Sequence, residues 1–113
     1  QQARAAVDDR FGGMHPVHTI NNACLTVWGL TIGGTDVSRV IAETVAMGLD
    51  NDCTAATAGS IVGAVVGKKG VPKHWSKNFD NTVHSYLIGK RKFAISSLVK
   101  RFATQAKKVH QGD

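Results

Sequence analysis

The sequence predicts an all-α fold, a compact multi-helix domain or a portion of one, and two observations support that prediction. Apolar residues recur at intervals of three, four and seven through several segments, a spacing that places them on one face of a helix. Glycine and proline separate these segments, as expected for loops between helices. No segment stands out as a strand. At 113 residues the chain is long enough for one domain or part of one.

The first half of the chain is predicted to contain three helical segments before its central stretch. Residues 1–7 form the tail of a helix. Residues 8–10 form a polar break, and we interpret the two acids there as a solvated helix end, with a second metal site as the alternative. After a loop broken by glycine and proline, a well-buried helix is predicted at residues 19–32. Another begins at residues 35–36 and delivers the chain to Asp50.

Three polar residues, His18, Asn21 and Asn22, stand at the entrance of the helix predicted at residues 19–32. One interpretation makes Thr19 or Asn21 the helix cap and His18 a hydrogen-bonded loop residue. The alternative is a role in binding substrate, because buried amides need hydrogen-bond partners and a ligand can supply them.

The chain is organised around residues 47–67, where an uncharged helix begins beside two carboxylates. Asp50 and Asp52 precede the segment from Cys53 to Gly67, which contains neither charge nor proline. Glycines recur there at every fourth position, and helical periodicity aligns them in a stripe against which another helix can pack closely: Gly59, Gly63 and Gly67. The carboxylates therefore fall in the first turn of a buried helix or in the loop entering it, where the helix dipole favours ionised acids.

Two interpretations of this acidic pair stay open. In the first, Asp50 or Asp52 caps the helix, an arrangement that contributes about 1 kcal/mol of stability. One acid satisfies that role, and the other is left beside an apolar helix. In the second, the two like charges, which repel each other and lose solvation, are brought together by a divalent cation such as Mg²⁺, which takes oxygen ligands.

The second half of the chain is predicted to begin with a connection at residues 68–70. Pro72 suits the first turn of a short helix that carries Trp75. A further short helix is predicted at residues 79–88, followed by a solvated loop at residues 89–92. Residues 95–109 form the clearest amphipathic helix, with apolar residues on one side and lysine and arginine on the other.

The net charge of +6 is unevenly distributed. Eleven of the fourteen lysines and arginines lie between Lys68 and Lys108, where the sole acid is Asp80. Such a bias can indicate nucleic acid or a phosphate ligand, but no known nucleic-acid module is visible, so nucleic acid is an unfavoured partner. We interpret the charges as a solvated basic face, or as a surface that a missing acidic segment normally balances.

The cysteine content and the hydropathy restrict the cellular compartments and classes of protein to which the chain can belong. Cys24 and Cys53 are too few for a secreted disulfide framework or a zinc site, and we predict reduced, buried thiols in a cytoplasmic protein. No segment reaches the roughly 18 to 20 apolar residues that cross a bilayer, so a membrane-spanning role is not expected. The chain begins with glutamine rather than methionine, which suggests an excised piece of something longer.

Taken together, these segments resemble the ADP-ribosylglycohydrolase family, also called the ADP-ribosylation/crystallin J1 type, from about Gly12 to Lys108. The strongest similarities are the segments HTINNA at residues 18–23, GLDNDCTAATAGSIVGA at 48–64 and GVPKHW at 70–75. Any one of them is weak alone, but the D-x-D pair entering a small-residue helix, followed by proline and tryptophan, is specific in combination. Ser97 stands where an acid is common in the family's last helix.

The resemblance implies a helical domain with two Mg²⁺ ions that hydrolyses the bond between ADP-ribose and a protein side chain or related group. Asp50 and Asp52 match the family's D-x-D metal ligands and are the expected catalytic residues. The next position is often a threonine ligand but is Cys53 here, and a thiol is a poor partner for Mg²⁺. The substrate-binding residues implied are His18, Asn22 and Asn51.

The family's other metal ligands lie in an upstream Ser/Thr-Asp-Asp segment that nothing before His18 matches. Residues 1–113 therefore resemble the C-terminal portion of a single domain, and we expect the chain alone to be inactive. We also expect association with the N-terminal part, or self-association with exchange of helices between chains.

Three hypotheses follow from the sequence. The first is a metal-dependent hydrolase acting on ADP-ribosylated substrates. The second is a non-catalytic family member that binds ADP-ribose or serves a structural role. The third is a basic helical module that binds nucleic acid.

Overall fold

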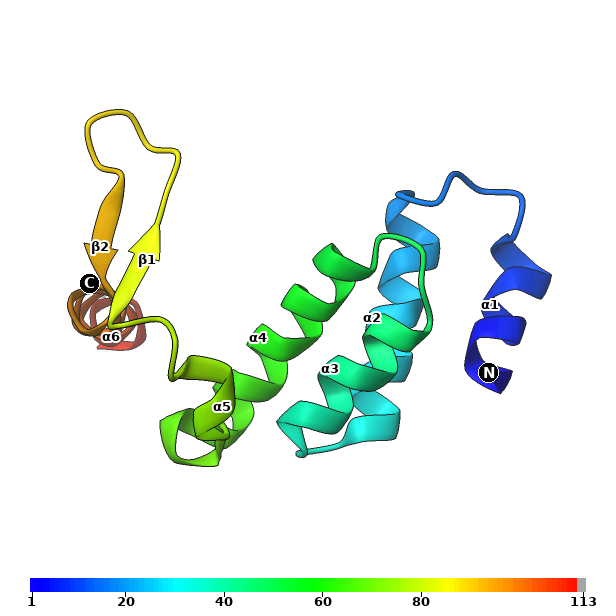
Figure 1. Cartoon of the computed structure of the whole chain (residues 1–113), viewed down its shortest axis with the longest axis horizontal. Coiled ribbons are helices and arrows are strands. Elements are labelled where there is room, and N and C mark those ends of the chain that lie inside the picture. Colours follow the sequence, from blue (N-terminus) through cyan, green and yellow to red (C-terminus); the bar gives the residue numbers. More distant parts are fainter. Residues whose placement is uncertain (112–113) are drawn as a thin grey trace. The chain divides into compact units, whose positions relative to one another are not determined.

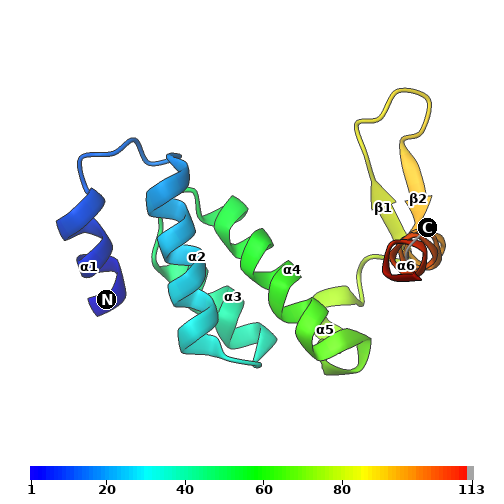
Figure 2. The same cartoon turned by 180° about the vertical axis from the view of Figure 1, so that it is seen from behind.

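The computed structural model describes residues 1–111 and confirms the all-α fold class. Six helices and one two-stranded sheet make up the described chain. The chain divides into two compact units, unit 1 at residues 1–72 and unit 2 from residue 73 onward (Figures 1 and 2). None of the helices within the described residues is long and apolar enough to cross a lipid bilayer.

Unit 1 is built from four helices. Their bounds are α1 (Gln2–Phe11), α2 (Thr19–Gly33), α3 (Val37–Ala46) and α4 (Asn51–Gly70). Helices α2, α3 and α4 pack against one another, and α1 packs against α2 (Figure 1). The N-cap of α3 is Asp36, whose carboxylate accepts a hydrogen bond from the backbone N–H of Arg39. Arg39 and Glu43, which lie four residues apart on α3, form an exposed ion pair at 3.9 Å.

Two small apolar clusters form the core of unit 1. The first joins α3 to α4 through buried Val37, Val40, Ala58 and Val62. The second joins α1, α2 and the chain after α3 through buried Val7, Leu25 and Met47. The second cluster also fixes the loop before α4, because Met47 and the neighbouring Leu49, which pack in it, lie just ahead of Asp50.

The closest helix approach in unit 1 lies on α2, not on the glycine stripe predicted in α4. A Cβ built on Gly29 would lie 1.9 Å from Thr44 Oγ1, and one built on Gly33 would lie 2.4 Å from Val40 Cγ2. In α4, by contrast, a Cβ on Gly63 would find its nearest neighbour at 4.0 Å. Of the predicted stripe only Gly59 lies against α3, where a Cβ built on it would be 3.4 Å from Ile41, and Gly67 has no neighbour within 4 Å. The stripe prediction therefore holds at Gly59 and fails at Gly63 and Gly67, and the two glycines of α2 give α3 its closer approach.

Several predicted boundaries in unit 1 need correction. Helix α1 continues through the predicted polar break at residues 8–10, because Arg4 and Asp8 pair across one helical turn. Helices α2 and α4 are each buried on one face, whereas we predicted well-buried helices. Gly67 ends the straight part of α4 as predicted, with φ of 66°, but the following residues add a further helical turn where a plain connection was expected.

Unit 2 contains the short helix α5 (Lys73–Ser76), the strands β1 (Thr82–His84) and β2 (Lys92–Ala94), and the helix α6 (Ile95–Gln111). The strands pair antiparallel, with Val83 opposite Phe93. Figure 1 shows the resulting hairpin with α6 seen end-on at its base. Short helix α5 carries Trp75 as predicted, and α6 matches the predicted amphipathic helix.

The hairpin contradicts the prediction of a helix at residues 79–88 and of a chain without strands. Asp80 and Asn81 both adopt positive φ, 45° and 50°, which ends any right-handed helix at that point. Gly89, with φ of 75°, lies in the turn that the sequence analysis treated only as a solvated loop. The apolar residues do recur at helical intervals in residues 79–88, but a helix cannot continue through Asp80 and Asn81, and a strand begins at Thr82 instead.

The glycine assignment yields a stability prediction. Gly29→Ala is expected to destabilise the chain by about 1–3 kcal/mol, because the new methyl group overlaps Thr44. Gly63→Ala, the matched control, is expected to stabilise it by about 0.5–1 kcal/mol, because alanine suits a helix interior better than glycine. Urea unfolding followed by circular dichroism measures both; equal effects of the two substitutions would restore the predicted stripe.

Candidate metal centre

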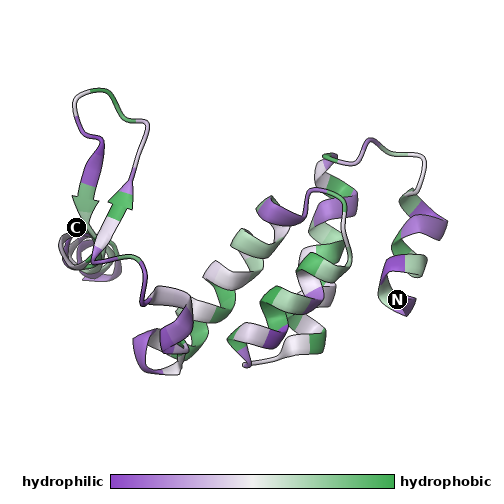
Figure 3. Ribbon diagram, viewed as in Figure 1, coloured by the Kyte–Doolittle hydropathy of each residue, from purple (hydrophilic) through white to green (hydrophobic). Residues whose placement is uncertain are grey.

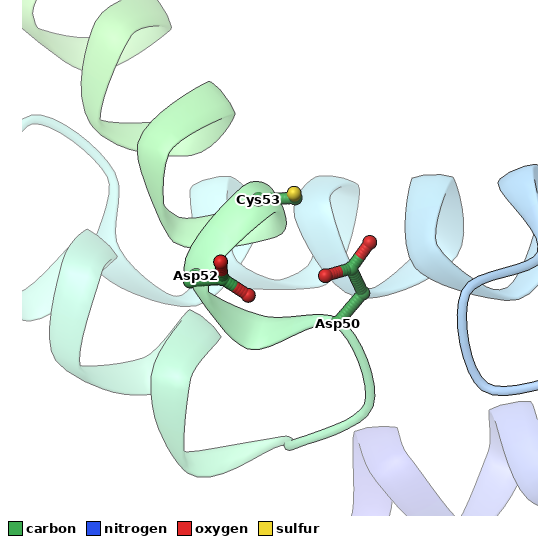
Figure 4. A group of neighbouring side chains, drawn as sticks. All are labelled: Asp50, Asp52 and Cys53. Atoms are coloured by element: carbon green, nitrogen blue, oxygen red, sulfur yellow. The ribbon is translucent and has the colours of Figure 1, made fainter.

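The two carboxylates singled out by the sequence lie together at the start of α4. Asp50 is the N-cap residue of α4 and Asp52 lies in its first turn. Figure 4 shows both side chains with that of Cys53 on the same side of this turn. Their ligand atoms, two carboxylate oxygens and one sulfur, all lie within 4.8 Å of one another. Within residues 1–111 this is the sole grouping of three such side chains.

The carboxylate oxygens of Asp50 and Asp52 are suitable ligands for a magnesium ion, whereas the sulfur of Cys53 is not. Mg²⁺ binds oxygen at about 2.0–2.1 Å, so two ligands of one ion lie roughly 3 to 4 Å apart. The ligand atoms of Asp50 and Asp52 lie within 4.8 Å of each other, which is close to that range. Sulfur is a soft ligand that Mg²⁺ does not favour, so Cys53 is a neighbour of the candidate site rather than a good ligand.

The capping interpretation of the acidic pair does not hold for Asp50. Although Asp50 occupies the N-cap position, its side chain makes no capping hydrogen bond. The ion pairs within the described residues join other partners, Arg4 with Asp8 and Arg39 with Glu43. The two carboxylates thus lie close together with no cationic side chain of the described residues paired to them, and a divalent cation would relieve their repulsion.

The loop that carries Asp50 has an unusual backbone. Gly48 and Leu49, the two residues before Asp50, both adopt positive φ, 76° and 59°. Leucine rarely takes this conformation, and such a conformation persists only where the surrounding structure determines it. Here the anchors are the side chains of Met47 and Leu49, which pack into the second apolar cluster.

Arg4 of α1 also binds the loop that carries Asp50, through a hydrogen bond to its backbone. Its Nη1 donates a hydrogen bond to the carbonyl oxygen of Met47. Its Nε lies 2.8 and 2.7 Å from the two carboxylate oxygens of Asp8, which orient the guanidinium. Helix α1 therefore contributes to the site through the loop backbone, although it supplies none of the three grouped side chains.

Asn22 joins the loop to the start of α2. Its Oδ1 accepts a hydrogen bond from the backbone N–H of Asp50 at 3.2 Å. Its Nδ2 donates to the carbonyl oxygens of Pro16 at 2.6 Å and His18 at 2.9 Å. One buried side chain thus joins the two regions that the sequence predicts to form the site, one around His18 and one around Asp50. Its observed contacts are internal, and binding of substrate by Asn22 stays a prediction.

The other two predicted substrate-binding residues also have structural contacts. His18 is the N-cap of α2, with Nδ1 accepting a hydrogen bond from the backbone N–H of Ile20 at 3.2 Å. The prediction of Thr19 or Asn21 as the cap is therefore wrong. Asn51 donates a hydrogen bond from Nδ2 to the carbonyl oxygen of Val45 near the end of α3, at 3.3 Å. Their contact with substrate likewise stays a prediction.

Cys53 is exposed, which corrects the prediction that both thiols are buried; Cys24 is half-buried. A hydrogen bond with the Asp50 carboxylate is the largest cause that raises the pKa of the Cys53 thiol, followed by the negative charges of Asp50 and Asp52. The thiol is therefore held protonated at neutral pH. A protonated thiol is a poor metal ligand and a poor nucleophile, so Cys53 is chemically quiet despite its exposure.

Sequence reasoning missed one residue that shapes the site, Arg4, whereas it had singled out Asn21 as a helix cap or a substrate-binding residue. Asn21 is buried, and its Oδ1 accepts a hydrogen bond from the backbone N–H of Asn22 at 2.8 Å. The spacing of Arg4 and Asp8 could have predicted their ion pair. Nothing local could have predicted the bond from Arg4 to Met47, because the two residues are 43 positions apart.

Comparison with known proteins assigns the chain to a family. A protein-family model described as ADP-ribosylglycohydrolase matches residues 1–111. The chain belongs to the ADP-ribosylglycohydrolase family. The match confirms the resemblance noted in the sequence and extends it over α1. No curated protein and no solved structure gives a significant match.

The hydrogen bonds of Asn22 lead to a prediction about the stability of the chain and the protection of the Asp50 amide. Asn22→Ala removes the acceptor of the Asp50 N–H and is expected to cost about 1–3 kcal/mol, because a half-buried donor is left unpaired. Asn51→Ala breaks an exposed bond and should cost less. Urea unfolding measures both, and hydrogen exchange of the Asp50 amide should accelerate specifically in Asn22→Ala. An unchanged exchange rate would contradict the tether.

The environment of Cys53 makes a second prediction, tested by alkylation with iodoacetamide across pH. Asp50→Asn removes the largest cause of the raised pKa, so the reaction of Cys53 should become faster at neutral pH. Asp52→Asn removes only a charge and should have a smaller effect. Cleavage after Arg39 separates the peptides of the two cysteines, and Cys24 provides the internal reference. The reverse order of the two variants would refute this account.

Proposed function

We propose that this chain carries part of the active site of a Mg²⁺-dependent hydrolase that cleaves an N- or O-glycosidic bond of ADP-ribose. The family assignment supports ADP-ribosylglycohydrolase-type function at the family level. The observation that supports the finer proposal is the placement of Asp50 and Asp52, whose oxygens lie close together with no cation of the described chain paired to them.

The proposed chemistry is the addition of water across a glycosidic bond. Water bonds to the anomeric carbon of the ribose, the bond to the leaving nitrogen or oxygen breaks, and a proton passes to the leaving group. When bound, Mg²⁺ supplies an orienting contact for the ribose hydroxyls and a more acidic water. Asp50 and Asp52 would hold that ion, and their negative charge would stabilise the positive charge that develops on the ribose in the transition state.

The remaining residues of the site position these carboxylates. Asn22 and Arg4 hold the loop backbone through Asp50 and Met47. Such fixation matters because a carboxylate that wanders by an ångström loses much of its contribution to catalysis. His18 and Asn51 lie at the two helix ends beside this loop, where we propose that they meet the substrate.

We further propose that the chain alone does not turn over substrate. Two carboxylates are too few to hold two magnesium ions tightly, and the described residues bring no third acid into the group. The same observation supports a second candidate function, a non-catalytic family member that binds ADP-ribose. Calorimetry with ADP-ribose separates the two, because binding that persists in EDTA without turnover favours the second.

Titration calorimetry with Mg²⁺ tests the proposed site directly. Asp50→Asn and Asp52→Asn should each weaken Mg²⁺ binding by about tenfold or more, because each removes a charged ligand. Asp9→Asn makes the same change of charge on an exposed residue of α1 outside the group and should have little effect.

The outcomes of that titration are distinct. If Asp9→Asn weakens binding as much as the site variants do, the ion responds only to net charge and the proposed site is wrong. If the unchanged chain hydrolyses a model compound carrying ADP-ribose on a guanidine nitrogen or on an oxygen, the proposed inactivity of the chain alone is wrong. If it binds no Mg²⁺ at millimolar concentration, the proposed metal site is wrong.

A further inference from the structure

Unit 2 leaves most of its apolar side chains exposed. No residue of α6 is buried, although the helix carries a full row of apolar residues. Phe102 is 73% exposed, Val99 60%, and Leu87 of the hairpin turn 61%. Figure 3 shows the hydrophobic colouring at the free end of the hairpin. A surface of this kind marks an interaction site when it is contiguous and rimmed by polar residues.

Two of these exposed residues, Leu87 and Phe102, line a groove between the hairpin and α6 together with further apolar side chains, so the apolar surface there is contiguous. The groove has a volume of about 790 Å³. Its apolar lining consists of Val83, Leu87, Phe93, Leu98 and Phe102. Lys90, Lys100 and Arg101 also line it, together with uncharged polar residues, and no acidic residue does. The site is therefore an apolar groove with positive charge and no compensating negative charge.

The positive charge of the groove belongs to a wider imbalance. Residues 73–111 hold nine lysines and arginines and one acid, Asp80. No lysine or arginine in this part of the described chain forms an ion pair. Charges at an interface are arranged so that opposite potentials meet, so the partner surface that fits here is acidic.

We propose that this groove binds an acidic amphipathic helix of a partner polypeptide. The apolar face of that helix would fill the groove, and its carboxylates would meet Lys90, Lys100 and Arg101. A helix suits a largely apolar groove because it satisfies its own backbone hydrogen bonds. Addition of a strand to the hairpin is a poorer fit, since β1 and β2 are each three residues long.

The same features disfavour three other occupants. A second copy of unit 2 would bring like charge against like charge. A flat membrane could contact the exposed rim but not the side chains inside a concave groove. Nucleic acid would meet the cations and could stack bases on the two phenylalanines, but it offers little apolar surface to cover the leucines and the valine. This proposal concerns unit 2 and does not depend on the hydrolase function proposed for unit 1.

The test uses the whole chain and a fluorescently labelled synthetic peptide of about 18 residues, with leucine on one helical face and glutamate on the other. Fluorescence anisotropy should show saturable binding that weakens about tenfold or more in Phe102→Ala and in Arg101→Glu. Lys107→Glu is the matched control, because it makes the same charge change on α6 outside the groove lining. It should weaken binding about twofold at most. Circular dichroism confirms that each variant keeps its helix content.

Each further outcome decides for or against the proposal. A peptide with lysine in place of glutamate should not bind, and a scrambled acidic peptide should bind much more weakly. Equal binding of the scrambled peptide, or equal effects of Arg101→Glu and Lys107→Glu, would reduce the interaction to net charge and overturn the proposal. Stronger binding to phosphatidylserine vesicles or single-stranded RNA than to the peptide, or concentration-dependent self-association that Phe102→Ala abolishes, would overturn it in favour of that occupant.

Discussion

The hydrogen bond between Asn22 and the Asp50 backbone is the constraint on which the candidate site depends. Two carboxylates repel each other, and a short loop left to itself would let them separate. This loop is held instead from three helices, by Arg4 of α1, Asn22 of α2 and the side-chain amide of Asn51 at the start of α4. Its positive-φ residues show that the surrounding contacts, rather than local preference, set its shape.

Packing elsewhere in unit 1 determines where Asn22 can stand. Gly29 and Gly33 allow α3 to lie almost directly on α2, and α3 then leads into the loop that carries Asp50. A bulkier contact between α2 and α3 would move the loop away from the start of α2, where Asn22 lies. Gly29 and Gly33 thus affect the position of the Asp50 loop indirectly, because they set the separation of α2 and α3.

The sequence predicted the fold class, the placement of Asp50 and Asp52 and the family, because each rests on local patterns. Helical spacing and the D-x-D pair are visible without any knowledge of tertiary structure. The predictions that failed required more. The spacing at residues 79–88 suits a helix, but Asp80 and Asn81 take left-handed conformations that spacing does not reveal. The glycines of α4 repeat regularly, yet which glycine touches a neighbour depends on where that neighbour lies. The bond from Arg4 to the loop joins residues far apart in the chain and was beyond local reasoning.

Each unit carries side-chain charges of one sign that no opposite charge of the described chain balances, and the kind of partner that would balance them differs between the two units. In unit 1 two negative groups converge within 4.8 Å, an arrangement that a single small cation neutralises and an extended partner cannot reach as closely. In unit 2 positive charges are spread along a groove with an apolar lining, an arrangement that an isolated ion cannot neutralise. The geometry of the charges, more than their number, therefore separates a metal ligand set from a protein-binding surface. The sequence showed only how many charges of each sign are present, whereas the structure shows where those charges lie relative to one another.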